Sequence, residues 1–408
     1  MWRQTEYDVS GRVSHRRTAK ERNSVRGITA EEWYTWDSGD RLTEDRIRWP
    51  EEQVPQMRVY RYDKADRIIS VVTDDHFGEC EEEYRYDEFG RLSRKWSASQ
   101  DQRFEYDADS RLVRVENVAG TLYTQVEMEY DLTGRRTAKR AHRRWTKAVE
   151  QTAFRWAGMR LYGEQQPDSP EVLFTYEEGS YAPLAQVLGR GEKTRVRWFR
   201  NGLNGSPEGL MDSDGMVKWR QQWPARLWGR ERHEVLKDAH GVMQNLRFQG
   251  QYLDRETGLH YNLFRYYDPE CGRFTQPDPA NLEGGINLYA YAPNPLGWID
   301  PWGLCKVHGN SKKSEKAQHG YEIRDTRTGK VVKTGISGGR IRKDGKSSRA
   351  EKQVRDWNNE PGNEGRYESD VVHHEPAGPG AREKALDWEK QNADKHRPTL
   401  DPERHKTP

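Results

Sequence analysis

The sequence has little cysteine, few aliphatic residues and no long apolar run. Only 33% of its 408 residues are hydrophobic, and its three cysteines, Cys80, Cys271 and Cys305, lie too far apart for a CxxC metal site or a disulfide framework. No segment approaches the ~20 apolar residues of a membrane span, and the N-terminus lacks the apolar core of a signal peptide. We therefore expect no membrane-spanning segment and no export by a cleaved signal, while delivery by another machine stays open.

The balance of charge and the aromatic content exclude two further classes of protein. The chain has 68 Lys and Arg against 66 Asp and Glu, and a net charge of +2 excludes a chain that coats nucleic acid along its whole length. A charged fraction of one third would suit a disordered chain, but 15 Trp and 20 Tyr are far more than such chains contain. We expect a folded protein of two or three domains of ~100–200 residues each.

A short motif recurs in the first third of the chain: an aromatic residue, Asp, three turn residues and Arg. The copies are YDVSGR, WDSGDR, YDKADR, YDEFGR, YDADSR and YDLTGR, which begin at Tyr7, Trp36, Tyr62, Tyr86, Tyr106 and Tyr130. Flanking stretches alternate as half-buried strands do, and Asp and Gly favour tight turns. Each copy predicts a β-hairpin, and stacked hairpins predict one long twisted sheet. We assign scaffold roles and no chemistry to these residues, and expect less regular strands to continue to residue 246.

The segment 247–304 is rich in aromatic residues and proline. It reads RFQGQYLDRETGLHYNLFRYYDPECGRFTQPDP, then ANLEGGINLYAYAPNPLGWIDPWGL. Prolines between Pro277 and Pro301 prevent a regular helix or a central strand, so we expect a compact plug. Asp278 and Asp300 each precede a proline, and from the residues alone they are interpreted as starters of Asx-type turns.

The composition changes after Leu304. Residues 305–408 lose the aromatic repeat, and their 23 Lys and Arg against 17 Asp and Glu give a net charge of about +6. A basic domain suits an anionic partner such as nucleic acid, although a small basic domain is often simply basic. The patterns predict a hairpin over 321–337, a helix from Arg349 capped by Ser347 or Ser348, a strand around Val371 and an amphipathic helix over 381–396. This order, ββαβα, is that of a small α+β domain.

The repeats and the dense segment together resemble the YD-repeat, or Rhs, family over about residues 1 to 304. The resemblance implies a mainly β chain in three parts: YD-repeat shell strands over 1–246, a core terminus over 247–304 and a C-terminal toxin domain over 305–408. Family shells enclose the toxin and are usually longer, so this chain is a fragment or forms a partial shell. The family also implies self-cleavage directly after the DPxGL motif, at the Leu304–Cys305 bond.

The family's catalytic carboxylates correspond to Asp278 and Asp300. Two carboxylates held close together share one proton, so one would activate a water while the other protonates the leaving group, as in aspartic proteases. The reaction would be a single turnover. Arg273 is a candidate for neutralising the developing charge, or a structural residue. The thiol of Cys305 offers a rival mechanism by attack on the preceding carbonyl.

Residues 308–404 resemble the GIY-YIG, or URI, nuclease superfamily through the hairpin, the KTGIS string and the RAEKQ helix. The resemblance implies that Tyr321 and Arg349 are catalytic, that Lys333 replaces the second motif tyrosine, and that Glu389, or alternatively Glu383, binds Mg²⁺ or another divalent metal. Further basic residues are expected to follow the phosphate backbone: Arg340, Arg342, Lys343 and Lys346. Without the resemblance, Tyr321 would be interpreted as a packing residue, and Arg349 and Glu389 as solvated helix residues.

Together the resemblances imply an antibacterial polymorphic toxin, a shell that cuts itself free from a metal-dependent endonuclease. They imply delivery by type VI secretion into the cytoplasm of competing bacteria, after a cytoplasmic stage in the producer. The expected partners are DNA or RNA as substrate, a cognate immunity protein and delivery proteins of the VgrG or PAAR type. Two alternatives stay open: a different toxin chemistry on nucleotides or ADP-ribose, and a non-enzymatic cell-surface binding module.

Overall fold

The computed structural model describes residues 2–19, 28–49, 54–167, 169–189, 194–221, 226–230, 234–237, 242–304, 307–308, 317–339, 341–342, 344–376, 380–402 and 404–405. The chain divides into two compact units. The first consists of Met1–Tyr176 and Tyr181–Lys306, and the second of Val307–Pro408 with the short turn Glu177–Ser180. Over the ranges given, no helix combines the length and the apolar character needed to cross a lipid bilayer.

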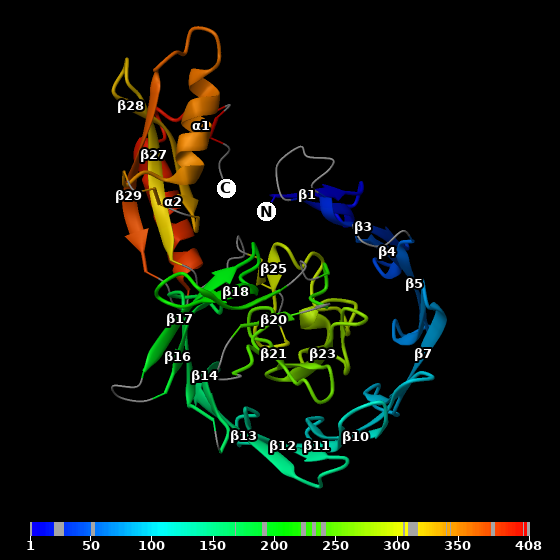
Figure 1. Ribbon diagram of the computed structural model, residues 1–408. Coiled ribbons are helices and arrows are strands. Elements are labelled where there is room, and N and C mark those ends of the chain that lie inside the picture. The colour runs from blue at the N-terminus through cyan, green and yellow to red at the C-terminus, as the bar shows by residue number, and fades with distance from the viewer. Residues whose placement is uncertain are drawn as a thin grey trace. The chain divides into compact units, whose positions relative to one another are not determined.

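The first unit is built on one antiparallel meander of 20 strands, in which each strand pairs with the next in sequence (Figure 1). Its first half comprises β1 Trp2–Tyr7, β2 Val13–Ala19, β3 Ile28–Trp36, β4 Leu42–Arg48, β5 Gln56–Tyr62, β6 Ile68–Asp75, β7 Gly78–Tyr86, β8 Leu92–Trp96, β9 Asp101–Tyr106 and β10 Leu112–Ala119. Its second half comprises β11 Tyr123–Tyr130, β12 Arg136–Arg143, β13 Val149–Ala157, β14 Arg160–Gln165, β15 Val172–Tyr176, β16 Pro183–Leu188, β17 Arg195–Asn201, β18 Pro207–Met211, β19 Val217–Gln221 and β20 Glu234–Leu236. The chain is therefore mainly β, as predicted.

The recurring motif makes the same contacts in every copy. Asp87 Oδ1 accepts hydrogen bonds from the backbone N of Phe89 and of Arg91, and its Oδ2 accepts one from Arg91 Nε at 2.7 Å. This Asp–Arg distance is 2.7 Å in all six copies. The Arg91 guanidinium lies 4.8 Å from the ring centroid of Tyr106, the aromatic residue of the next copy, and the other neighbouring copies repeat this contact. The motif closes one hairpin and stacks it on the next, so its three residues recur together.

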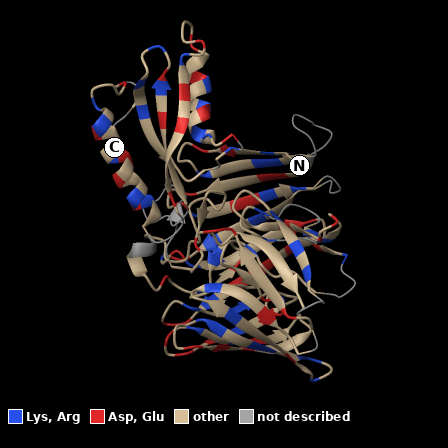
Figure 2. Cartoon of the chain, turned by 90° about the vertical axis from the view of Figure 1, so that its left-hand side faces the viewer, with Lys and Arg blue, Asp and Glu red and all other residues tan. Residues whose placement is uncertain are grey.

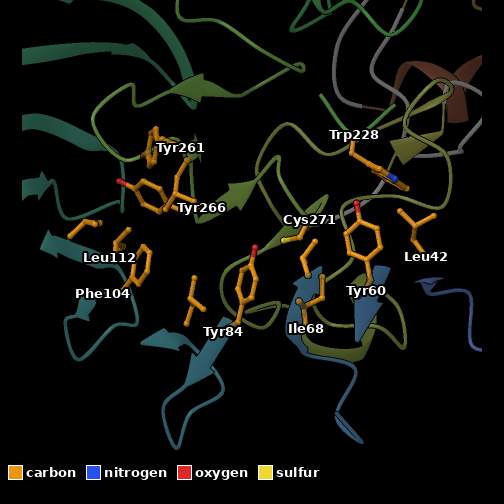
Figure 3. Packing of buried hydrophobic residues seen from close by; sticks show 14 of the residues in the cluster. Leu42, Tyr60, Ile68, Tyr84, Phe104, Leu112, Trp228, Tyr261, Tyr266 and Cys271 are labelled. Carbon is orange, nitrogen blue, oxygen red and sulfur yellow. The ribbon is translucent and has the colours of Figure 1, made fainter. Parts of the chain in front are cut away.

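The segment 245–304 forms a plug on the concave face of the sheet (Figure 1). Its elements are β21 Tyr252–Leu253, β22 His260–Asn262, β23 Arg265–Asp268, β24 Arg273–Phe274, a 3₁₀ turn Asn281–Gly284 and β25 Trp298–Ile299. Strand residues such as Tyr60 and Leu112 share one apolar core with Tyr261 and Tyr266 of the plug (Figure 3). Buried ion pairs also join the sheet to the plug, and in one of them Lys95 Nζ lies 2.8 Å from an oxygen of Asp268.

The second unit is a three-stranded antiparallel sheet with strand order β28-β27-β29, and one helix covers each face. Its elements are β26 Val307–His308, β27 Gln318–Asp325, β28 Lys330–Ser337, α1 Ser348–Asn358, β29 Tyr367–Glu375 and α2 Ala381–His396. On β27, His319 bonds Ser347 beside α1, and Tyr321 packs in the cluster that includes residues of α1. The residue after Tyr321, Glu322, accepts a hydrogen bond from Asn392 of α2. Alternate residues of the central strand thus face different helices.

Candidate functional site

Four of the residues singled out from the sequence line one cavity of the second unit, with a volume of about 180 Å³. Tyr321 comes from β27, Lys333 from β28, Arg349 from the first turn of α1 and Glu389 from α2. They meet at β28, which is an edge strand of the sheet. Because the two helices cover opposite faces, an edge strand is where side chains from both helices can reach one cavity.

The position of Tyr321 depends on a glycine opposite to it. The β27–β28 register pairs Tyr321 with Gly335, and the absence of a side chain there lets the phenol ring lie across the edge strand. Gln353 Nε2 of α1 donates a hydrogen bond to the phenol oxygen at 3.2 Å. Burial raises the pKa of Tyr321, although the nearby charge of Arg349 acts in the opposite direction. The phenol is therefore protonated at neutral pH and able to donate a hydrogen bond to a ligand.

The N-terminal cap of α1 places Arg349. The Ser347 hydroxyl accepts a hydrogen bond from the backbone N of Ala350 and lies 2.8 Å from Nε2 of His319 on β27. This chain of contacts ties the first helical turn to the central strand, and a side-chain cap of this kind stabilises a helix by about 1 kcal/mol. The exposed guanidinium of Arg349 lines the cavity, where it can bind an anionic oxygen.

The packing of Trp388 places the neighbouring Glu389. A Cβ on Gly320 would come within 2.1 Å of the Trp388 ring, and this ring stacks at 4.8 Å between centroids on His373, the partner of Gly320 on β29. Burial raises the pKa of the half-buried Glu389, and Arg382, Arg349 and Lys333 partly offset the effect. Glu383, the alternative metal ligand, is exposed and does not line the cavity.

A residue of the C-terminal segment, Arg404, fixes the side chain of Lys333. Its Nζ donates a hydrogen bond to the backbone O of Arg404. Burial lowers the pKa of Lys333, the charge of Arg349 lowers it further, and Glu389 acts in the opposite direction. Lys333 is therefore a cation of reduced pKa inside the cavity, with its ammonium group already engaged as a donor.

Two further residues of the cavity escaped the sequence analysis. Arg382 lies on α2 seven residues before Glu389, and its Nη1 donates a hydrogen bond to Gln318 Oε1 at 2.8 Å. Helical spacing from Glu389 could have identified it. His405 also lines the cavity. It follows the last helix in a segment without periodicity, so no sequence signal marked it.

The predicted phosphate-contacting residues lie outside this cavity or outside the described residues. Arg340 and Lys343 belong to the latter group. Arg342 forms ion pairs of 2.9 Å with Asp344 and 3.0 Å with Glu351, and Lys346 lies 3.8 Å from Glu351. Acidic and basic residues are mixed along the strands and helices of the second unit (Figure 2). The positive charge is therefore not gathered at Arg342 and Lys346.

A second candidate site lies in the plug, where one guanidinium bridges two aspartates. Arg265 Nη2 lies 2.9 Å from Asp278 Oδ2 and 3.2 Å from Asp300 Oδ2. All three side chains are buried. A cation between two carboxylates favours the ionised form of both, which differs from the shared proton expected from the sequence. Asp278 also starts an Asx turn, because its Oδ1 accepts a hydrogen bond from the backbone N of Ala280.

The same residues hold the chain directly before the predicted cleavage position. Asp300 Oδ1 accepts a hydrogen bond from the backbone N of Leu304 at 3.0 Å, and Arg265 Nε donates one to the backbone O of Gly303. Cys305, the residue after the predicted bond, lies outside the described residues.

Arg273 does not lie between the aspartates. Its Nη2 donates hydrogen bonds to Asn287 Oδ1 and to the backbone O of Asp66, both at 2.7 Å. From the sequence, Arg273 was a candidate either for neutralising charge or for a structural role, and its contacts support the structural role. Arg265, which the sequence analysis missed, occupies the place beside the two carboxylates.

Comparison with known proteins identifies the repeat region. Residues 3–151 match the family model described as Teneurin YD-shell. The chain is 34% identical over 320 residues to double-stranded DNA deaminase toxin A of Burkholderia cenocepacia (strain H111). The aligned segment covers 73% of this chain and 20% of that protein. The chain is 32% identical over 261 residues to probable deoxyribonuclease RhsA of Dickeya dadantii (strain 3937), which covers 60% and 17%.

A third relative is toxin protein Tse5 of Pseudomonas aeruginosa, 33% identical over 256 residues, with 54% of the chain and 18% of that protein covered. A solved structure, the crystal structure of TcdB2-TccC3-Cdc42, aligns with 74% of this chain and 18% of that chain, at 18% identity and a TM-score of 0.42. The chain spans about a fifth of the length of these curated relatives. The repeat region is therefore YD-shell sequence, and the chain is related to the Rhs/YD-repeat toxins.

Proposed function

We propose that the second unit is a metal-dependent nuclease and that the chain acts as part of an antibacterial toxin. One observation supports this proposal above all: four residues from four different elements line one cavity, namely Tyr321, Lys333, Arg349 and Glu389. The relatives named as a DNA deaminase toxin and a probable deoxyribonuclease support nucleic acid as the class of substrate. Deaminases of nucleobases hold zinc with closely spaced cysteines and a histidine, and the three widely separated cysteines here do not fit that pattern.

The cavity has the charges that phosphodiester hydrolysis requires. Arg349 and Arg382 would bind the non-bridging oxygens of the scissile phosphate and neutralise the charge that grows on them. The protonated phenol of Tyr321 would donate a hydrogen bond to the same group. Lys333 would add a further positive charge from the edge strand. Contacts of this kind recognise the backbone and not the bases.

Glu389 is the residue that fits a divalent ion. Mg²⁺ usually keeps several waters and takes one or two carboxylates together with substrate phosphates, so a single carboxylate in a cavity shaped for an anion suits it. Among the described residues, no group of three or more His, Cys, Asp or Glu side chains could form a cage made of protein ligands alone. An ion bound at Glu389 would neutralise phosphate charge and lower the pKa of a bound water.

The full chain tests this proposal with supercoiled plasmid and total RNA, in the presence of Mg²⁺ and then of EDTA. We expect degradation that depends on the divalent ion, and the polymer that disappears identifies the substrate. Glu389→Gln should reduce cleavage by roughly 10²-fold or more, whereas Glu383→Gln on the exposed side of the same helix should retain it. Intact DNA and RNA after incubation with Mg²⁺ would refute the proposed nuclease.

We also propose that the chain cuts itself at Leu304–Cys305. One carboxylate of the Asp278 and Asp300 pair would accept a proton from the water as the water oxygen bonds to the Leu304 carbonyl carbon, and Arg265 would stabilise the negative charge that develops. The C–N bond to Cys305 would then break, and the same carboxyl group would give its proton to the leaving nitrogen. The bond is presented within the same chain, and such proximity supplies much of the rate enhancement. Asp278→Asn and Asp300→Asn should each leave a single uncut band on a denaturing gel, while the exposed Asp109→Asn should be cut normally. Complete cleavage in either dyad variant would refute the assignment.

We further propose a route by which the toxin reaches its target cell and a means by which the producer is protected. The freed nuclease would act in the cytoplasm of a competing bacterium after transfer by type VI secretion, with VgrG- or PAAR-type proteins as carriers. In the producer, where the chain is cytoplasmic before export, an immunity protein would bind the second unit. This route is supported if killing of the competitor requires the producer's secretion genes and if a co-expressed immunity protein prevents it. Killing that continues without those genes would refute it.

A further inference from the structure

The segment after α2 lies along the edge strand that carries Lys333. Thr399 Oγ1 donates a hydrogen bond to the backbone O of Val331 at 2.7 Å, and the backbone N of Asp401 donates one to the backbone O of Val332 at 2.9 Å. We call the described residues of 399–405 the C-terminal strap. These bonds satisfy backbone groups that an edge strand would otherwise expose, so the strap is an integral part of the sheet edge.

Arg404 fixes the far end of the strap. Its guanidinium lies 4.7 Å from the ring centroid of Trp357 on α1 and 4.9 Å from that of Tyr367 on β29. Its backbone O accepts the hydrogen bond from Lys333 Nζ. The strap therefore begins at α2 and ends against residues on the α1 side of the sheet. The next residue, His405, lines the cavity, and its backbone N donates a hydrogen bond to the backbone O of Asp401 at 2.7 Å.

The His405 ring is buried, with 6% of its surface exposed, and lines the cavity. The backbone of Thr334 interacts with the ring and raises its pKa, whereas its buried Nε2 has no hydrogen-bond partner among the described residues. The interaction with Thr334 is therefore assigned to Nδ1. An imidazole that donates through Nδ1 to a carbonyl carries its lone pair on Nε2. Burial and the charge of Lys333 lower the pKa of His405, and the bond to Thr334 acts in the opposite direction, so the ring is neutral at pH 7.

Two more buried polar atoms that belong to cavity residues, Thr334 Oγ1 and Gln353 Oε1, also have no hydrogen-bond partner within the part of the chain that the structure describes. Buried polar groups are nearly always hydrogen-bonded, and exceptions call for an explanation. Three such atoms around one small cavity point to a polar ligand or to water that takes part in the reaction.

The other candidates for a proton acceptor in this cavity are already engaged. The phenol of Tyr321 is protonated at neutral pH, because burial raises its pKa. Lys333 Nζ acts as a donor to the strap. Glu389 is the residue that suits the divalent ion. Among the described lining residues, His405 is the one that offers a neutral nitrogen lone pair.

We propose that His405 is the general base of this site, a role that rests on the proposed nuclease function. Nε2 removes a proton from a water molecule while the water oxygen forms a bond to phosphorus. The bond between phosphorus and the bridging ester oxygen breaks, and the leaving oxygen takes a proton from solvent. His405 then returns its proton to solvent. The strap thus contributes a catalytic residue and does not merely cover the sheet edge.

The test uses the full chain with His405→Ala and His405→Gln, assayed on the polymer that the wild type cleaves. Loss of a general base lowers the rate by roughly 10²–10⁴-fold, and we expect this loss with little change in melting temperature. Added imidazole should restore part of the His405→Ala activity, and across substituted imidazoles the restored rate should rise with the pKa of the added base. The exposed His374→Ala on β29 is the matched control and should cleave at the wild-type rate.

The rescue series separates His405 from its titratable neighbours. Tyr321, Lys333, Arg349, Arg382 and Glu389 face the same cavity from β27, β28, α1 and α2, so a simple pH profile would report several groups at once. Wild-type rates in His405→Gln, or no rescue of His405→Ala by any imidazole, would overturn the assignment while wild-type cleavage still supports the nuclease. Absence of cleavage by the wild type would overturn both.

Discussion

The ring of Tyr321 lies so close over Gly335 that a Cβ at residue 335 would come within 2.5 Å of the phenol. The two residues face each other across β27 and β28. The glycine of the KTG string therefore has a geometric role, because it leaves room for an aromatic side chain of the neighbouring strand to reach the cavity.

Gly335→Ala should displace Tyr321 and impair the proposed nuclease. Overpacking of this kind typically costs about 1–3 kcal/mol of folding free energy, and we expect the cleavage rate to fall by more than the loss of folded protein explains. Thermal melting and plasmid or RNA cleavage on the same sample separate the two effects. Gly339→Ala, where the nearest atom to the new Cβ is the Ser337 hydroxyl, should behave like the wild type. A Gly335→Ala protein of normal rate would contradict this account.

Arg265→Lys should block self-cleavage. A lysine keeps the positive charge, but its single ammonium group cannot contact Asp278, Asp300 and the Gly303 carbonyl with the fixed geometry of a guanidinium. The expected result is an uncut chain on a denaturing gel. Arg273→Lys is the matched control, because Arg273 contacts Asn287 and Asp66 instead, and it should be cut. Equal cleavage of the two variants would show that the bridging arginine is dispensable.

Glu389 should lower stability at neutral pH relative to acid pH. Burial raises its pKa in the folded protein above the ordinary value of 4.5, so between these two values the folded state binds more protons than the unfolded state. Stability then falls as pH rises through this interval. Glu389→Gln should raise the melting temperature of the second unit near neutral pH and leave it unchanged at about pH 3, where the carboxyl group is protonated in both states. Calorimetry at both pH values tests this, with Glu383→Gln as the variant that changes neither.

Asp87→Ala should weaken the first unit more than a change at the neighbouring Glu88. Asp87 accepts three hydrogen bonds within its turn, and we expect its loss to cost about 1–3 kcal/mol, since hydrogen bonds to a charged group contribute more than neutral ones. Glu88 is exposed in the same turn, and Glu88→Ala should change stability by at most about 0.5 kcal/mol. Chemical denaturation followed by tryptophan fluorescence measures both. Equal midpoints would contradict the structural role of the motif.

The hairpins of the YD-repeat region were predictable because their decisive contacts are local. Each Asp binds the Arg four residues later, so six residues contain the complete turn. The helices of the second unit were predictable from the sequence for the same reason. Ser347 is a side-chain cap adjacent to its helix, and α2 spans Ala381–His396, the range that the amphipathic pattern predicts.

The roles of Arg265 and Arg273 could not be separated in this way. Both precede aromatic residues in short strands of the plug, and Arg273, the candidate named from the sequence, is not the one that lies between the aspartates. Arg265 reaches carboxylates 13 and 35 residues away only after the plug has folded. Contacts between residues so far apart depend on the path of the intervening chain, which local propensities do not specify.

Residue order alone therefore determined the repeat, the ends of the helices and the chemical types that suit a phosphate-binding cavity. Packing in three dimensions decided that Glu389 and not Glu383 faces that cavity, that Arg265 lies between two aspartates, and that His405 returns to the edge of β28. The physical reason is the separation along the chain between the residues that contact each other. Turns and caps close within a few residues, whereas a cavity is assembled from strands and helices whose relative positions depend on the burial of the whole unit.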